Sequence, residues 1–113
     1  QKFDLIVVDV AFISLVKIIP NLKNYISSGG GLVCLVKPQF ELERKQLNKK
    51  GVVKDPAQVE KVVEKIVGVF RENQLEIIGT CPSPIEGENG NKEVLLYSIL
   101  PESVDAKRVS DET

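Results

Sequence analysis

Histidine does not occur in this 113-residue sequence, and cysteine occurs only twice. Without histidine, nucleophilic sites of the Ser/His/Asp and Cys/His types are excluded, and the commonest zinc ligand is missing. Any chemistry must therefore use carboxylates, lysines or a cofactor, and we expect no metal site. Cys34 and Cys81 lack CxxC spacing, so we expect both to be reduced, with Cys34 a small core residue.

Methionine is missing as well, and the chain opens on Gln1 directly before a predicted strand. Because a gene product begins with methionine, we expect these residues to be a piece of a longer protein. No apolar run approaches the roughly 20 residues that a membrane span needs, and nothing resembles a signal peptide. The net charge is −1, so no global positive field favours nucleic acid or an anionic membrane. We expect a cytoplasmic protein without a membrane partner, in which any contact with nucleic acid is local.

The first half of the chain predicts a strand, a helix and a second strand. Residues 3–10, FDLIVVDV, are apolar and β-branched, which is typical of a strand buried on both faces of a parallel sheet. Ser14 suits a helix N-cap, and Pro20 predicts a kink within that helix. The apolar residues at helical spacing are Leu15, Ile18, Ile19, Leu22 and Ile26. The triple glycine at 29–31 predicts a helix stop and turn, and residues 32–37 predict the second buried strand.

The second half predicts a helix and two further strands. The helix begins at Pro56, which suits a first helical turn, and its apolar stripe faces the core. The stripe consists of Val59, Val62, Val63, Ile66, Val67 and Phe70. Residues 75–82 and 93–100 predict the third and fourth strands, joined by a turn-rich loop. We expect residues 102–113 to form a flexible tail.

This order of elements is typical of an open α/β sheet with right-handed crossovers. No helix separates the last two strands, so we expect them to pair antiparallel. Ligands in such sheets bind beyond the carboxyl ends of the parallel strands, where Asp9 and Lys37 lie. Glu93 begins the reversed fourth strand on the same rim. If that strand inserts beside the second one, the three charged side chains converge at one edge of the sheet.

Lys37 directly precedes Pro38 at the end of an apolar run. Proline restricts the residue before it to an extended backbone, so Pro38 ends the strand and aims the lysine over the rim. A solvated strand end is the alternative interpretation of Lys37, since lysines often extend their charged heads to water.

The segments VVDVAFISL, LVKPQFE, KKGVVKD and SPIEGENGNKE, in this order, resemble the C-terminal half of one methyltransferase family. This is the hemolysin A (TlyA) family of FtsJ-like RNA ribose methyltransferases, and the resemblance runs to about Leu100. One departure is Ala11, where the family usually carries serine.

The resemblance implies a class I, Rossmann-like methyltransferase fold that uses S-adenosylmethionine, with ribosomal RNA or ribosomal subunits as partner. It implies a Lys-Asp-Lys-Glu catalytic tetrad that acts on a ribose 2'-hydroxyl. Asp9, Lys37 and Glu93 match the aspartate, the second lysine and the glutamate, with Lys37 as base or orienting group. Asp9 and Val10 are the expected cofactor contacts.

The family's first tetrad lysine, glycine-rich cofactor loop and S4-like RNA-binding domain are not in this sequence. Residues 1–101 would therefore be the C-terminal part of the methyltransferase domain. We expect the isolated chain to be inactive, and we expect it to self-associate through an unprotected edge strand, Phe3 to Val8.

A charged loop follows Lys37 on the expected ligand rim. Its basic residues are candidate RNA phosphate contacts, although an ordinary solvated loop is equally consistent with them. These residues are Arg44, Lys45, Lys49, Lys50 and Lys54. In the later loop, Gly87, Gly90 and Asn91 either serve turns with positive φ or touch substrate.

Three other functions remain open from the sequence. A non-catalytic RNA-binding module with a degenerate methyltransferase fold is the main alternative. A dinucleotide-dependent oxidoreductase could share this half-sheet, but it gives Lys37 and Glu93 no common role. A pore-forming hemolysin, which the family name suggests, would need an amphipathic or membrane-spanning segment that the sequence does not contain.

Overall fold

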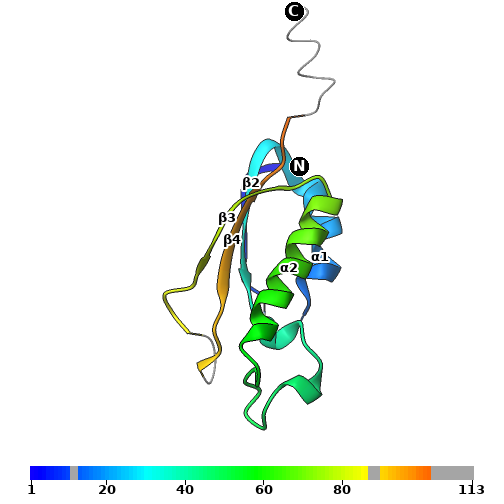
Figure 1. The fold of residues 1–113 in the computed structure, drawn as a ribbon. Helices are drawn as coiled ribbons and strands as arrows, with labels where there is room; N and C mark the ends of the chain where they lie inside the picture. The colour runs from blue at the N-terminus through cyan, green and yellow to red at the C-terminus, as the bar shows by residue number, and fades with distance from the viewer. Residues whose placement is uncertain (11–12, 87–89, 103–113) are drawn as a thin grey trace, which may run out of the picture.

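A four-stranded mixed sheet with two α-helices on one of its faces makes up the described part of the chain (Figure 1). The computed structural model describes residues 1–10, 13–86 and 90–102. The elements are β1 (Phe3–Val8), α1 (Leu15–Leu22), β2 (Ile26–Val36), α2 (Ala57–Glu72), β3 (Glu76–Pro82) and β4 (Val94–Ile99). Short 3-10 turns cover Lys23–Tyr25, Pro38–Phe40 and Arg44–Gln46. None of the described helices combines the length and the apolar character that crossing a membrane requires.

The strands lie in the order β1-β2-β4-β3. β1 and β2 are parallel, whereas β4 runs antiparallel to both of its neighbours, β2 and β3. The predicted antiparallel pairing of the last two strands is therefore confirmed, and the fourth strand lies beside the second, which was the condition for the charged residues to converge. Cys34 lies opposite Leu96 and Val36 opposite Val94, so β4 begins where β2 ends.

The triple glycine lies inside β2, so the predicted turn at 29–31 is wrong. Helix α1 ends at Leu22, and Ile26 is the buried first residue of β2 rather than part of the helix stripe. The register against β1 jumps between Phe3↔Ile26 and Leu5↔Gly31, which marks a bulge. A Cβ on Gly30 would come within 2.8 Å of the Ser27 carbonyl oxygen. Glycine therefore lets β2 bulge and still pack closely against β1.

One face of the sheet is left open by the two helices. Phe3, Leu5 and Val7 of β1 are 48%, 57% and 68% exposed, so the predicted burial of this strand on both faces is wrong. The reason is topological. The connections from β1 to β2 and from β2 to β3 advance across the sheet in the same direction, and right-handed crossovers then bring both helices to the same side.

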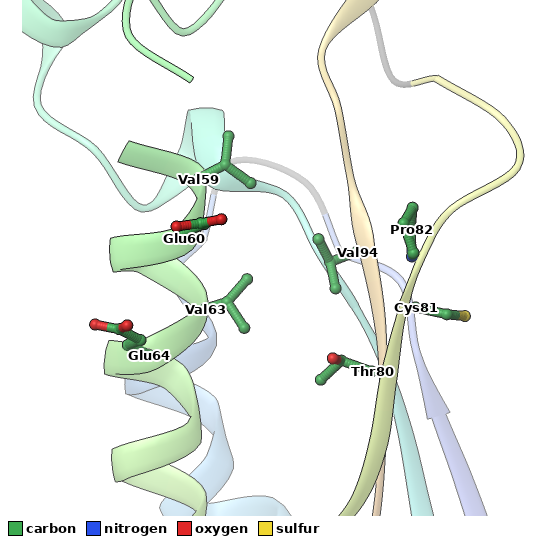
Figure 2. Close-up of a pocket in the computed structure, with 8 residues that line it drawn as sticks. All are labelled: Val59, Glu60, Val63, Glu64, Thr80, Cys81, Pro82 and Val94. Atoms are coloured by element: carbon green, nitrogen blue, oxygen red, sulfur yellow. The ribbon is translucent and has the colours of Figure 1, made fainter. Parts of the chain in front are cut away.

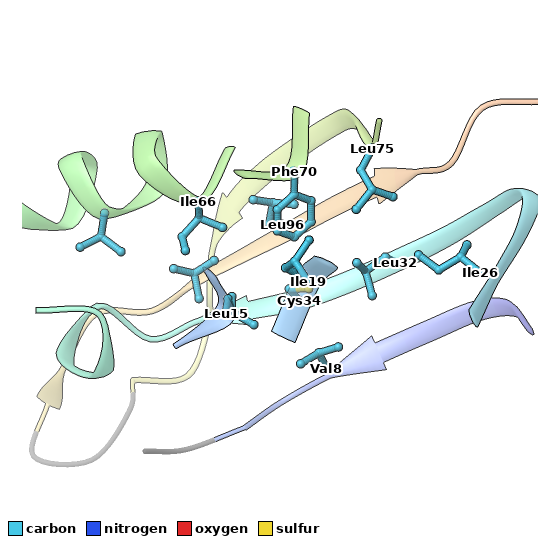
Figure 3. Close-up of a cluster of buried hydrophobic side chains, with 12 residues drawn as sticks. Val8, Leu15, Ile19, Ile26, Leu32, Cys34, Ile66, Phe70, Leu75 and Leu96 are labelled. Carbon is cyan, nitrogen blue, oxygen red and sulfur yellow. The ribbon is translucent and has the colours of Figure 1, made fainter. Parts of the chain in front are cut away.

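The core fills the space between that covered face and the helices (Figure 3). Val62, Ile66 and Phe70 of the predicted α2 stripe are buried, and their partners on the sheet include Leu32 and Leu96. The other residues predicted for this stripe, Val59, Val63 and Val67, are partly buried.

The two cysteines are free thiols, as expected. Cys34 is buried in the core, and burial raises the pKa of its thiol to about 12, because desolvation disfavours the thiolate. Cys81 is exposed on β3.

Ser14 is the N-cap of α1, as predicted, and its hydroxyl oxygen accepts a hydrogen bond from the Val16 amide at 3.1 Å. Pro20 lies inside the helix. Ala11, Gly87 and all but the first residue of the predicted tail, 102–113, lie outside the described residues.

Candidate active site

Asp9 and Lys37 form an ion pair at the carboxyl ends of β1 and β2. The Lys37 Nζ lies 2.6 Å from Asp9 Oδ1, so the two side chains are in the expected contact. Lys37 has an extended backbone, with φ −112° and ψ 94°, and Pro38 begins a 3-10 turn directly after it. The Lys37 side chain is 18% exposed and that of Asp9 61%, so the lysine head reaches the rim while its stem is largely covered.

Glu93 lies on the same rim because β4 runs against β2. Val36 pairs with Val94, so the next positions along these two chains are Lys37 and Glu93. Glu93 is 7% exposed, and its Oε2 accepts a hydrogen bond of 2.9 Å from the Gln39 side-chain amide. Among the described ion pairs, none joins Lys37 to Glu93. The structure thus brings the three predicted residues to one edge as an Asp9–Lys37 pair with Glu93 adjacent.

Alternate residues of the segment 37–41 are attached to three other elements. Lys37 binds the end of β1 and Gln39 binds the start of β4, as described above. Glu41 Oε2 accepts a hydrogen bond of 2.8 Å from the Leu15 amide, and its Oε1 accepts one from the Ser14 hydroxyl. A carboxylate is well placed there, because the first amides of a helix lack partners within the helix and carry partial positive charge. The segment therefore ties together β1, β4 and the start of α1.

The contacts of Gln39 and Glu41 were not predicted from the sequence. Their partners are 26 to 54 residues away, and no local pattern indicates such contacts. The usable signal was the spacing of polar residues at 37, 39 and 41 in KPQFE, directly after a buried strand.

The predicted basic residues all lie on the surface of the loop that follows this segment. Arg44, Lys45, Lys49, Lys50 and Lys54 are exposed. Lys45 lies 3.4 Å from Glu43, and both side chains of this pair are solvated, so the pair contributes little to stability. The loop tip is a defined turn, because the Asn48 side-chain oxygen accepts hydrogen bonds from the Lys50 and Val52 amides at 2.8 Å and 3.0 Å.

Asn91 attaches this basic loop to the start of β4. Its Nδ2 donates to the Gly51 carbonyl at 3.0 Å, and its Oδ1 accepts from the Val53 amide at 3.1 Å. Asn91 is 3% exposed, whereas Gly90 has a φ of +85°, a conformation that glycine adopts without steric cost. The basic loop is therefore held two residues from Glu93.

Asp9 and Val10, the expected cofactor contacts, line a groove of about 440 Å³ between β1 and α1. The groove opens at the carboxyl end of β1, where this fold class binds ligands. A second groove, of about 410 Å³, lies between α2 and the β3–β4 pair (Figure 2). It is lined by Val59, Glu60, Val63, Glu64, Thr80, Cys81, Pro82 and Val94, and none of the predicted site residues is among them.

Comparisons with curated proteins find relatives that include RNA methyltransferases. The 16S/23S rRNA (cytidine-2'-O)-methyltransferase TlyA of Mycobacterium tuberculosis is 36% identical over 96 residues, which cover 85% of this chain and 36% of that protein. Hemolysin A of Brachyspira hyodysenteriae is 35% identical over 95 residues, which cover 84% of this chain and 40% of that protein. The chain thus spans little more than a third of the length of these relatives.

Solved structures support the same relationship. A candidate hemolysin from Streptococcus thermophilus superposes with a TM-score of 0.82 at 37% identity, over 88% of this chain and 36% of that one. A SAM-dependent methyltransferase from Methanosarcina mazei superposes with a TM-score of 0.59 at 17% identity, over 90% of this chain and 61% of that one. The second likeness shows the fold alone.

A model of the FtsJ-like methyltransferase family matches residues 1–99, nearly all of the described chain. Together with curated relatives at 35% to 38% identity over most of the sequence, this match shows that the chain belongs to the FtsJ-like methyltransferase family.

Proposed function

We propose that this chain is the C-terminal part, residues 1–101, of a methyltransferase domain that modifies a ribose 2'-hydroxyl of ribosomal RNA. The Asp9–Lys37 ion pair, with Glu93 on the same rim of an FtsJ-like fold, is the observation that carries the proposal. The TlyA protein of M. tuberculosis is named for this reaction and is similar over 85% of the chain. A cytoplasmic location, where ribosomes work, fits this function.

We propose S-adenosylmethionine as the cofactor, which when bound supplies an electrophilic methyl group. Asp9 and Val10 would hold it, because they line the groove at the carboxyl end of β1. The exposed Asp9 carboxylate offers a hydrogen-bond acceptor there, and the apolar wall of the groove suits the uncharged parts of a nucleoside.

Lys37 acts on the ribose. The hydroxyl must lose its proton as the new O–C bond forms. As the free amine, Lys37 would receive that proton at its Nζ; as the ammonium of the ion pair, it would instead orient the hydroxyl by donating a hydrogen bond to the oxygen. Asp9 holds the Nζ over the rim, so the lysine meets the hydroxyl in a fixed position. Glu93 accepts a hydrogen bond from a donor brought to the same edge.

Lys37 is the residue whose substitution tests this function. In the full-length enzyme, we expect Lys37→Ala to lower the rate of methyl transfer about 100-fold or more, because the group that acts on the hydroxyl is removed. Lys37→Arg should lower the rate of methyl transfer almost as much, since a guanidinium keeps its proton and has a different shape. Single-turnover methylation of ribosomal RNA measures both rates, and calorimetry should show nearly unchanged cofactor affinity. Near-normal rates in both variants would instead show that Lys37 takes no part in the reaction and is only a solvated strand end.

The exposed basic loop should bind RNA phosphate groups. Replacing Lys45, Lys49 and Lys50 by glutamine in the full-length enzyme should weaken RNA binding and flatten its salt dependence, by about 0.7 to 0.9 in slope per lost contact. Cofactor affinity should hardly change. The matched control replaces three exposed cations of α2, Lys61, Lys65 and Arg71, by glutamine. If the salt dependence of RNA binding has the same slope in both triple variants, the loop does not contact RNA phosphate groups.

The 113-residue chain alone should bind the cofactor weakly and methylate nothing. The reason is that its sequence lacks the family's glycine-rich cofactor loop and offers only one side of the crevice in which such folds bind ligands. Isothermal titration with S-adenosylmethionine tests this expectation. Micromolar affinity would contradict it.

The chain alone should also self-associate through β1. This strand is at an edge of the described sheet, and its exposed apolar residues can pair with another strand. Light scattering at increasing concentration should show growing mass, and Val7→Lys should reduce the association by adding charge to the edge. Ile85→Lys, in an exposed loop, is the matched control. A monodisperse monomer at every concentration would refute the expectation.

A further inference from the structure

Gln39 is the described hydrogen-bond partner of the Glu93 carboxylate. Both residues are 7% exposed, and the 2.9 Å bond between Gln39 Nε2 and Glu93 Oε2 links positions that are 54 residues apart. A glutamine amide has one donor end and one acceptor end, and an ionised carboxylate only accepts. In the bond with Glu93, the donor end of the amide faces the carboxylate.

This orientation leaves the other end of the amide unsatisfied. Gln39 Oε1 is buried and has no hydrogen-bond partner among the described residues. A buried carbonyl without a partner costs free energy, and most such groups in proteins are paired. An apolar side chain of similar shape would avoid that cost. The contact with Glu93 is therefore what the glutamine contributes at this position.

The backbone around Gln39 is itself held rigidly next to Lys37. Pro38–Phe40 forms a 3-10 turn in which the Phe40 amide donates to the Lys37 carbonyl at 3.0 Å. The Glu41 amide donates to the Pro38 carbonyl at 2.9 Å. Only Pro38 separates Gln39 from Lys37, so this turn fixes the distance along the chain between Lys37 and the residue that holds Glu93.

We propose that Gln39 is a positioning residue of the methyl-transfer site. It holds Glu93 by Oε2 and leaves the second carboxylate oxygen to accept a hydrogen bond from the bound ribose. This inference rests on the proposed function, because it assumes that Glu93 takes part in the reaction.

A double-mutant cycle in the full-length enzyme tests the role of Gln39. Gln39→Met keeps the shape and removes the donor, so we expect a rate of single-turnover methyl transfer about 10- to 100-fold lower, with cofactor affinity unchanged. Adding Gln39→Met to Glu93→Ala should cause no further loss, because the carboxylate that Gln39 positions is already gone. Gln74→Met is the matched control, with an expected wild-type rate, since it removes the hydrogen-bond partner of Lys23 at the opposite end of the sheet.

A second measurement follows Glu93 directly by NMR, in the 113-residue chain carrying Val7→Lys to limit self-association. With Gln39 in place the two γ-methylene protons of Glu93 should have separate shifts, which should merge in Gln39→Met as the side chain rotates freely. Separate shifts in the variant, or losses that multiply in the double mutant, would overturn the positioning role. If Glu93→Ala methylates at the wild-type rate, Glu93 takes no part in the proposed reaction. Gln39 then has no role in that reaction either, even if the two proton shifts merge in Gln39→Met.

Discussion

The antiparallel pairing of β4 with β2 is the constraint on which the candidate site depends. A reversed strand begins at the edge where its parallel neighbours end, so the residue before β4 meets the residue after β2. Had β4 paired parallel to β2, Glu93 would lie at the opposite edge of the sheet from Lys37. The direction of this one strand therefore decides whether the three charged residues form a site.

The segment that follows β2 organises this edge. Its side chains at 37, 39 and 41 reach the end of β1, the start of β4 and the first turn of α1. Because these contacts share five residues of chain, a shift of the segment would move all of them together. Asn91 adds a further link, by which the basic loop is fixed relative to the same edge. The rim is thus a connected set of polar contacts around a rigid turn.

The covered and open faces of the sheet have different roles. α1 and α2 bury the face that forms the core, whereas β1 exposes apolar side chains on the opposite face and along its edge. Apolar surface of this kind is typical of regions that another part of a protein or another chain covers. The chain covers about a third of the length of its curated relatives, and the groove lined by Asp9 and Val10 also opens beside β1.

Much of this protein is determined by local sequence. The β-branched runs, the Ser14 cap and the apolar stripe of α2 predicted most elements, because each depends on residues close together in the chain. The lysine before Pro38 and the lack of a helix between β3 and β4 were enough to place Asp9, Lys37 and Glu93 on one rim.

Tertiary structure alone decided the rest. The triple glycine became a bulge inside β2 because β1 packs against it, and β1 is exposed on one face because both crossovers turn to the same side. Gln39, Glu41 and Asn91 have partners 26 to 54 residues away, so no local pattern could assign them. Contacts of that range form only when the sheet order brings distant segments together, and this is why the supporting contacts of the site were not predictable from the sequence.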